Sequence, residues 1–237
     1  MSGSDPHDPA VAVSAQYARR DPACDAQRYS LFDAAALQAQ QERLREMLAL
    51  WRTHGWQTLS GRRITEVGCG SGGNLLDLLR LGASAECLTG IELLTDRVAA
   101  ARACLPAALR LVEGDAATQS VESDSQDAVL AFTVFSSLLE DGTQERLAEA
   151  IWNWTKPGGG VLWYDFVFDN PGNPDVRGVS MRRLRELFPV AHLTVRRITL
   201  APPLARALAR AHPGLVRALA PCLPFLKSHR LVWARKP

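Results

Sequence analysis

The sequence has few of the features that mark secreted, membrane-spanning or metal-binding proteins. None of its apolar runs approaches the length of about 18 residues that can cross a bilayer. Residues 1–9 lack the basic start and the apolar run of a secretory signal. The five cysteines show neither CxxC pairing nor histidines at ligand spacing, so no metal site is indicated. A reduced, cytoplasmic setting is expected.

Acidic residues are almost missing from the C-terminal quarter of the chain. Residues 177–237 hold 13 Lys and Arg against one acid, Glu186, while residues 1–176 hold 14 bases and 24 acids. The two parts therefore carry net charges of +12 and −10. This asymmetry suggests an anionic partner, such as a phosphorylated substrate, nucleic acid or the inner face of a membrane. The alternative is that the two parts neutralise each other within one fold.

The length of 237 residues, 47% of them hydrophobic, suits one α/β domain with little chain left for a second. Residues 1–20 are expected to form a flexible tail, residues 21–60 an N-terminal helical cap, and residues 61–237 the main domain. Strands are predicted at 64–67, 87–92, 110–112, 127–132, 161–166, 192–200 and 230–234. Helical patterns at 37–51, 74–80, 95–104 and 144–154 alternate with them, which favours a parallel sheet with right-handed crossovers.

A long connection separates the last two predicted strands. Residues 201–228 begin with Ala201-Pro202-Pro203 and carry leucines and arginines at helical spacing. A connection of this length with amphipathic helices of its own is usually functional. We expect a helical insertion that packs on the end of the sheet, with interfacial membrane binding as the alternative.

A glycine-rich loop is the strongest motif of the chain. Glycines 68, 70, 72 and 73 follow the first strand and precede a helix that begins near Asn74. Glycine lets a ligand approach the backbone, and a helix N-terminus offers unpaired N–H groups. The strand, loop and helix together predict a nucleotide-type cofactor site.

Three carboxylates follow three successive strands and indicate which cofactor this is. Glu66 precedes the loop, where its charge opposes a pyrophosphate but suits a ligand with an ammonium and a sulfonium. Glu92 follows the second strand and could accept from ribose hydroxyls. Asp115 follows the third and could accept from an adenine amino group. The spacing Gly68-x-Gly70-x-x-Gly73 also fits a dinucleotide site, so an NAD-dependent oxidoreductase remains an alternative.

These motifs resemble, in order, those of the class I S-adenosylmethionine-dependent methyltransferases. The matching segments are 66–72, 91–92, 114–116, 127–132 and 156–163, within a resemblance that covers residues 60–200. It implies a Rossmann-like fold with a seven-stranded, mostly parallel sheet and an antiparallel last strand. It also implies S-adenosylmethionine as the cofactor and S-adenosylhomocysteine as the product. The expected cofactor-binding residues are Glu66, Gly68, Cys69, Gly70, Gly72, Asn74, Glu92, Leu93, Asp115, Ala116 and Phe132.

The acceptor is expected beyond the fourth and fifth strands, because ligands of such sheets bind at the carboxyl ends of the strands. Asp165 is the predicted general base and Tyr164 the residue that orients the acceptor, with His192 and His229 as other base candidates. The predicted acceptor-binding residues are Tyr29, Thr133, Asn170, Asn173, Asp175 and Arg177. The polar residues at 169–177 have an alternative role, which is to form the turns of their own loop.

The segments 163–166, 170–178, 187–189 and 199–206 resemble a methyltransferase subgroup associated with bacterial cell-surface polysaccharide assembly. This resemblance implies an O-methyltransferase that acts on a sugar hydroxyl or a phosphate of a glycan or of its lipid-linked precursor. Asp169 stands where the subgroup has asparagine. The alternatives are a methyltransferase of small natural products, an RNA methyltransferase and a binding module without catalysis.

Overall fold

The protein is described by a computed structural model that covers residue 15 and residues 30–169 and 173–237. Apart from residue 15, the predicted N-terminal tail lies outside these residues, as do Tyr29 and Asn170. No helix within the described ranges combines the length and the apolarity that a bilayer span requires.

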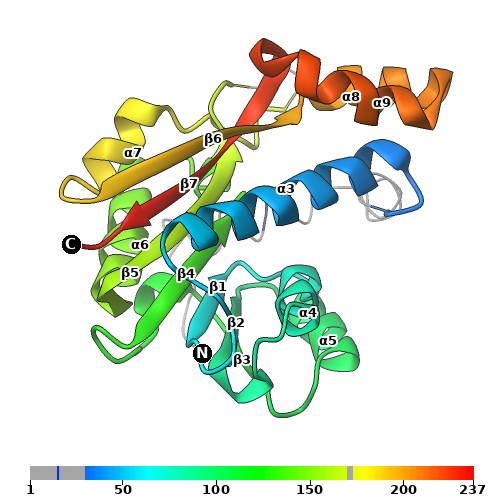
Figure 1. The fold of residues 1–237 in the computed structure, drawn as a ribbon. Helices are drawn as coiled ribbons and strands as arrows, with labels where there is room; N and C mark the ends of the chain where they lie inside the picture. Colours follow the sequence, from blue (N-terminus) through cyan, green and yellow to red (C-terminus); the bar gives the residue numbers. More distant parts are fainter. Residues whose placement is uncertain (1–14, 16–29, 170–172) are drawn as a thin grey trace.

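A seven-stranded sheet forms the centre of the molecule, with the strand order β3-β2-β1-β4-β5-β7-β6 (Figure 1). The strands are β1 (Ile64–Val67), β2 (Leu88–Glu92), β3 (Arg110–Glu113), β4 (Gln126–Phe132), β5 (Thr155–Phe166), β6 (His192–Leu200) and β7 (Lys227–Arg235). The first five strands pair in parallel, and β7 runs antiparallel to both β5 and β6. The predicted sheet is confirmed, although β5 starts six residues before its predicted start at residue 161.

Helices cover both faces of the sheet. The first face carries α3 (Ala34–Thr53), α4 (Gly73–Arg80) and α5 (Thr95–Cys104), whose apolar residues share a core with β1, β4 and β7. The second face carries α6 (Asp141–Trp154) and α7 (Met181–Leu187). Helix α7 was not predicted from the sequence; it is only seven residues long and begins where Ser180 accepts from the N–H of Arg183.

A cluster of tryptophans fixes α3 across the sheet. Trp51, near the end of α3, stacks on Trp56 with ring centroids 5.0 Å apart, and Trp233 of β7 meets both rings edge-on. Trp51 and Trp233 are fully buried. Because large aromatic side chains dominate the energy of burial, this cluster holds α3 in a fixed position over β6 and β7.

The predicted insertion between β6 and β7 consists of two helices and two short 3-10 turns. These are α8 (Pro202–Ala211), α9 (Pro213–Leu219), η4 (Ala220–Cys222) and η5 (Pro224–Leu226). Figure 1 shows α8 and α9 together beyond the N-terminal half of α3, at one end of the sheet. Ala35 of α3 shares a small core there with Leu200, Ala205 and Val216.

The register of the parallel strands brings their carboxyl ends to one edge. Val67 pairs with Ile91 on one side and with Ala131 on the other, and Phe132 pairs with Tyr164. The segments that leave β1, β2, β4 and β5 therefore start side by side. This edge is where open α/β sheets bind their ligands.

Candidate functional site

The loop after β1 turns tightly enough that two of its positions require glycine. Gly68 has φ +64°, and a Cβ there would lie 2.8 Å from Cγ2 of Val134. Gly72 has φ +85°, and a Cβ there would lie 2.6 Å from Cδ1 of Leu105. Gly72 is also the N-cap of α4 and offers no side chain to the first N–H groups of that helix. The loop thus presents bare backbone at the edge of the sheet.

Glu92 ties this loop to the end of β2. Its two carboxylate oxygens accept from the N–H of Gly70 at 2.8 Å and from the N–H of Leu94 at 2.9 Å. The side chain is 5% exposed and lines a pocket. Hydrogen bonds to an ionised group are the stronger ones, so Glu92 fixes the shape of the loop as well as part of the pocket wall.

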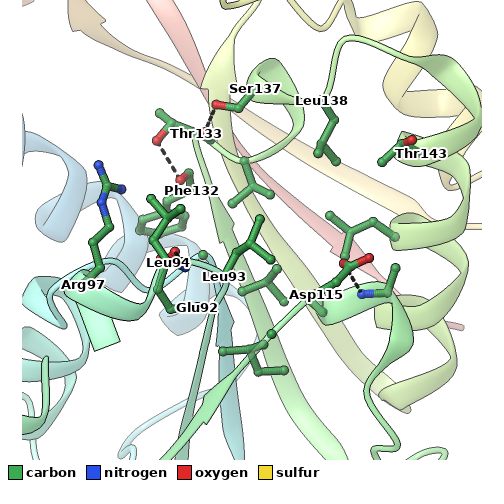
Figure 2. Close-up of a pocket in the computed structure, with 18 residues that line it drawn as sticks. Glu92, Leu93, Leu94, Arg97, Asp115, Phe132, Thr133, Ser137, Leu138 and Thr143 are labelled. Atoms are coloured by element: carbon green, nitrogen blue, oxygen red, sulfur yellow. Dashed lines mark hydrogen bonds between the residues drawn. The ribbon is translucent and has the colours of Figure 1, made fainter. Parts of the chain in front are cut away.

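The pocket lies between the carboxyl ends of β1, β2 and β4 and the helix α6 (Figure 2). Asp115 lines it and accepts from the N–H of Ala117 at 2.9 Å, which caps the turn η2 (Ala116–Thr118). Apolar side chains complete the walls. The eighteen lining residues are Val67, Gly68, Ile91, Glu92, Leu93, Leu94, Arg97, Gly114, Asp115, Ala116, Ala117, Phe132, Thr133, Val134, Ser137, Leu138, Thr143 and Leu147.

Glu66 has a buried carboxylate with one oxygen unpartnered. Its Oε1 accepts from Nδ2 of Asn74 at 2.5 Å, whereas its Oε2 is buried without a hydrogen-bond partner. Burial raises the pKa of Glu66 to about 8, against the opposing effect of the Asn74 hydrogen bond. A buried oxygen without a partner destabilises the fold, and it marks a place where a cationic ligand would be stabilised.

Arg43 of α3 extends this polar network toward β4 and β5. Its Nη2 donates to Oδ1 of Asn74 at 3.0 Å. Its guanidinium lies 5.4 Å from the ring centroid of Phe132 and 5.2 Å from that of Tyr164. These are cation–π distances, so the two rings hold a positive charge beside the end of the cofactor loop.

Tyr164 is held from two sides by two threonines, each of which has an uncommon backbone conformation. Its carbonyl accepts from the N–H of Thr133 at 2.7 Å, and its hydroxyl lies 2.9 Å from Oγ1 of Thr199. Thr133 and Thr199 have φ of +55° and +61°. Positive φ is rare for β-branched residues and costs energy, so the surrounding contacts must enforce it. The N–H of Thr199 donates to the buried carboxylate of Glu42 at 3.0 Å.

Asp165, the predicted general base, faces the other side of the sheet. Its Oδ2 accepts from the N–H of Ser136 and its Oδ1 from the N–H of Phe166, each at 2.9 Å. The side chain is fully buried, and this burial raises its pKa to about 7. Asp165 is not among the residues that line the pocket. Its contacts are those of a residue that secures the turn η3 (Phe135–Ser137) after β4.

The two histidines considered as bases each lie near the start of their strand, but at opposite ends of the sheet. His229 pairs with Phe166 at the carboxyl end of β5, and its ring stacks on Tyr164 with centroids 4.9 Å apart. Burial and the charge of Arg43 lower the pKa of His229 to about 3, so its ring is neutral. His192 is exposed and pairs with Arg235 at the opposite end of the sheet. Only His229 therefore lies near Tyr164 and Arg43.

Three residues predicted to bind the acceptor, Asn173, Asp175 and Arg177, form bonds within or beside the loop after β5, as does Asp169. Asp169 accepts from the N–H of Gly178, and Asn173 accepts from the N–H of Asp175. Arg177 forms an ion pair with Asp141 at the start of α6 at 2.5 Å. These contacts match the alternative role of this segment, in which polar side chains shape their own loop. Thr133, also predicted for the acceptor, lines the pocket instead.

Three comparisons with known proteins bear on this site. Residues 64–159 match the family model described as a methyltransferase domain. These residues include the glycine loop, Glu92, Asp115 and β4. The chain is an S-adenosylmethionine-dependent methyltransferase. The predicted cofactor is confirmed over the dinucleotide alternative.

Solved structures share the fold of this methyltransferase at low sequence identity. A methyltransferase of Mesorhizobium loti has a TM-score of 0.58 at 19% identity, over 78% of this chain and 95% of the other. Geranyl diphosphate C-methyltransferase of Streptomyces coelicolor has a TM-score of 0.65 at 14% identity, over 99% and 100%. Phosphoethanolamine N-methyltransferase 2 of Haemonchus contortus has a TM-score of 0.57 at 17% identity, over 81% and 53%. No curated protein sequence matches the chain.

The residues of the methyltransferase fit its cofactor. The unpartnered Oε2 of Glu66 could accept from the ammonium of the methionine part. Glu92 and Asp115 line the pocket where carboxylates could accept from ribose and purine groups. When bound, S-adenosylmethionine supplies a methyl group that a sulfonium activates for displacement. Within the described ranges, no cluster of three His, Cys, Asp or Glu side chains offers a metal site.

Six of the eleven predicted cofactor residues line the pocket, and five do not. The six are Gly68, Glu92, Leu93, Asp115, Ala116 and Phe132. Glu66, Cys69, Gly70, Gly72 and Asn74 lie in or beside the loop instead. The pocket wall at Ser137, Leu138, Thr143 and Leu147 was not predicted from the sequence, and neither was Arg43. Arg43 lies in a helix with many Gln, Glu and Arg residues, so no sequence signal separated it from solvent-exposed neighbours.

Proposed function

We propose that this methyltransferase modifies an oxygen of a phosphate-bearing glycan or of its lipid-linked precursor. Arg43 carries the proposal. Its guanidinium lies against Phe132 and Tyr164, and its bond to Asn74 links it to Glu66. A planar guanidinium is well suited to bind phosphate, and aromatic neighbours keep it away from bulk water.

The chemistry of a phosphate oxygen also suits the residues of this site. Methyl transfer is a displacement in which the enzyme chiefly positions the nucleophile. A phosphate oxygen is already ionised at neutral pH, whereas a sugar hydroxyl must lose a proton to a general base. Asp165 would then serve as a positioning residue that holds η3, because both of its oxygens accept backbone N–H groups. Tyr164 would form the floor of the acceptor site under Arg43.

Two of the similar structures support an acceptor of this class by analogy. Their names specify geranyl diphosphate and phosphoethanolamine as the molecules methylated, and both molecules carry phosphate. The resemblance of segments 163–166 and 170–178 to enzymes of cell-surface polysaccharide assembly points to a glycan. A lipid-linked glycan would be reached at the inner face of a membrane, with the basic C-terminal region of the chain toward the bilayer.

A panel of acceptors tests this function directly. The purified protein is incubated with S-adenosylmethionine and a sugar 1-phosphate, a polyprenyl diphosphate-linked sugar, or the matched glycoside without phosphate. Mass spectrometry should detect a methylated product with the phosphorylated acceptors only. With the sugar 1-phosphate, a methyl ester of the phosphate resists alkaline phosphatase, whereas a methyl ether on the sugar leaves the phosphate open to it. Methylation of the neutral glycoside alone would overturn the proposal.

A second candidate is the methylation of a small natural product. It is favoured by the match to geranyl diphosphate C-methyltransferase over 99% of this chain, which includes the α8 and α9 region. Geranyl diphosphate belongs in the same panel. Its methylation on carbon, without any product from the sugar acceptors, would select this candidate.

A further inference from the structure

The segment between β6 and β7 exposes apolar side chains that the fold does not bury. Leu215, Phe225 and Leu226 are 36%, 70% and 38% exposed. Leu31 and Phe32, just before α3, are 47% and 103% exposed. These five are a majority of the nine large apolar side chains that are exposed in the described ranges. Exposed apolar side chains that lie together on a surface mark an interaction site.

The charged residues of the C-terminal segment that contains Leu215, Phe225 and Leu226 have a single sign. Residues 187–237 contain nine Lys and Arg and no Asp or Glu. Three of them, Arg206, Arg210 and Arg217, lie on α8 and α9. Lys227 pairs with Glu42, Arg196 with Glu46 and Lys236 with Asp124. Among the described residues, none forms an ion pair with Arg206, Arg210 or Arg217.

The insertion is held firmly enough to present a defined surface. Ala205 of α8 and Val216 of α9 are buried against Ala35 of α3, with Leu204 and Leu208 packed beside them. The inward faces of both helices are therefore occupied. Arg210, Leu215 and Arg217 are on the exposed side. We call Arg206, Arg210, Leu215, Arg217, Phe225 and Leu226 the insertion surface.

We propose that the insertion surface docks on an anionic lipid bilayer. Apolar residues flanked by arginines match the interface of such a bilayer, where headgroups carry negative charge above the acyl chains. Phe225, Leu226 and Leu215 enter the interface, and the three arginines bind the headgroups. Arginine suits this place because its long apolar stem can lie in the interface while its charge stays at the surface.

Docking here would bring the bilayer close to the acceptor side of the molecule. Phe225 and Leu226 form η5, which leads directly into β7. Lys227 and His229 follow within three residues of Leu226, and they contact Glu42 and Tyr164. A lipid-linked acceptor, which rests on the function proposed above, would then leave the bilayer beside Tyr164 and Arg43.

Vesicle sedimentation with the full chain tests the docking surface without any acceptor. The protein should sediment with vesicles of phosphatidylcholine and phosphatidylglycerol and should dissociate from them at high salt. It should not sediment with vesicles of phosphatidylcholine alone. Each arginine near such a surface contributes about fivefold to binding, so Arg206→Glu, Arg210→Glu and Arg217→Glu together should weaken it at least about 100-fold. The pair Phe225→Ser and Leu226→Ser should weaken it about tenfold.

A matched control separates the surface from the overall charge. Arg102, Arg110 and Arg182 are exposed and lie outside the insertion, so their joint change to Glu alters the net charge equally. This control should bind anionic vesicles nearly as wild type does. Equal loss in both triple variants, or no preference for anionic vesicles, would refute the proposal. So would a wild-type dimer that Phe225→Ser and Leu226→Ser dissociate, since a second copy would then cover the surface. If no acceptor of the panel were methylated, the result for vesicle binding would not change, so each proposal can be refuted without the other.

Discussion

The two ends of the ligand-binding edge are built in different ways. At the cofactor end, the glycine loop, Glu92 and Asp115 are within 50 residues of each other and contact neighbouring backbone. At the proposed acceptor end, Arg43, Tyr164 and His229 come from α3, β5 and β7 and meet through side chains. The first end depends on local geometry, which tolerates little change. The second depends on the packing of distant elements, so its parts can vary one at a time.

Among the substitutions that test this difference between the two ends, Glu92→Ala at the cofactor end should have the largest effect. The change removes the acceptor of two backbone N–H groups and one carboxylate of the pocket. Each such charge-assisted bond contributes about 1.5–3 kcal/mol, so S-adenosylhomocysteine should bind at least about 100-fold more weakly. Isothermal titration measures this affinity.

Glu113 provides a matched control for Glu92. It ends the adjacent strand β3, is exposed, and contacts only the hydroxyl of Thr95 among described residues, at 2.6 Å. Glu113→Ala should bind S-adenosylhomocysteine as wild type does. If Glu92→Ala bound it within about threefold of wild type, the cofactor end would not depend on this carboxylate.

Substitution of Glu66 should change both the stability of the protein and its affinity for the cofactor. The pKa of Glu66 is raised from 4.5 to about 8, so the folded state favours the neutral carboxyl. This contribution to stability is fully present below about pH 4.5 and is lost as the pH rises through about 8. Glu66→Gln keeps a neutral side chain at every pH. Between pH 6 and 9 the wild type should lose on the order of 2 kcal/mol more free energy of unfolding than the variant.

The same substitution should weaken cofactor binding about tenfold, because the amide cannot pair with an ammonium. Thermal unfolding without ligand and titration with S-adenosylhomocysteine measure the two effects. A variant that is less stable than wild type at pH 9, or that binds equally well, would contradict the role given to Oε2 of Glu66. Asp165, whose pKa is raised to about 7, titrates in both proteins and cancels in the comparison.

The contrast also explains which parts of the molecule the sequence could predict. The glycine loop and the strand-end carboxylates could be predicted because the role proposed for them depends on neighbours along the chain. Arg43 could not, since its role arises only when the tryptophan cluster at Trp51 fixes α3 across the sheet. Asp165 was placed on the correct strand, but the alternation of side chains in β5 points it to η3 while Tyr164 faces α3.

Substitution of Arg43 should act mainly on the proposed acceptor end. Arg43→Met removes the charge but keeps a long apolar side chain against Phe132 and Tyr164. The KM for the phosphorylated acceptor should rise about tenfold, since a charge-assisted contact is lost. Affinity for S-adenosylhomocysteine should fall only about twofold, through the lost bond to Asn74. Arg45, exposed two residues away, supplies the control Arg45→Met. An unchanged KM would exclude Arg43 from acceptor binding.

The smallest effect should come from Tyr164→Phe, which removes one hydroxyl from the acceptor end. The hydroxyl bonds to Thr199, so the free energy of unfolding should fall by about 1 kcal/mol while S-adenosylhomocysteine binds as before. Denaturant unfolding measures the first quantity. Thr199→Val removes the same bond from its other side while keeping a β-branched residue.

The double variant then shows what holds Thr199 at φ +61°. If both single substitutions act only by removing the hydrogen bond between Tyr164 and Thr199, the double variant should lose about as much stability as either single variant, because the bond can be lost only once. Additive losses would mean that the two side chains act separately. In that case the carboxylate of Glu42, which accepts from the N–H of Thr199 at 3.0 Å, would alone enforce the strained backbone. The acceptor end would then depend on α3 for its backbone as well as for its charge.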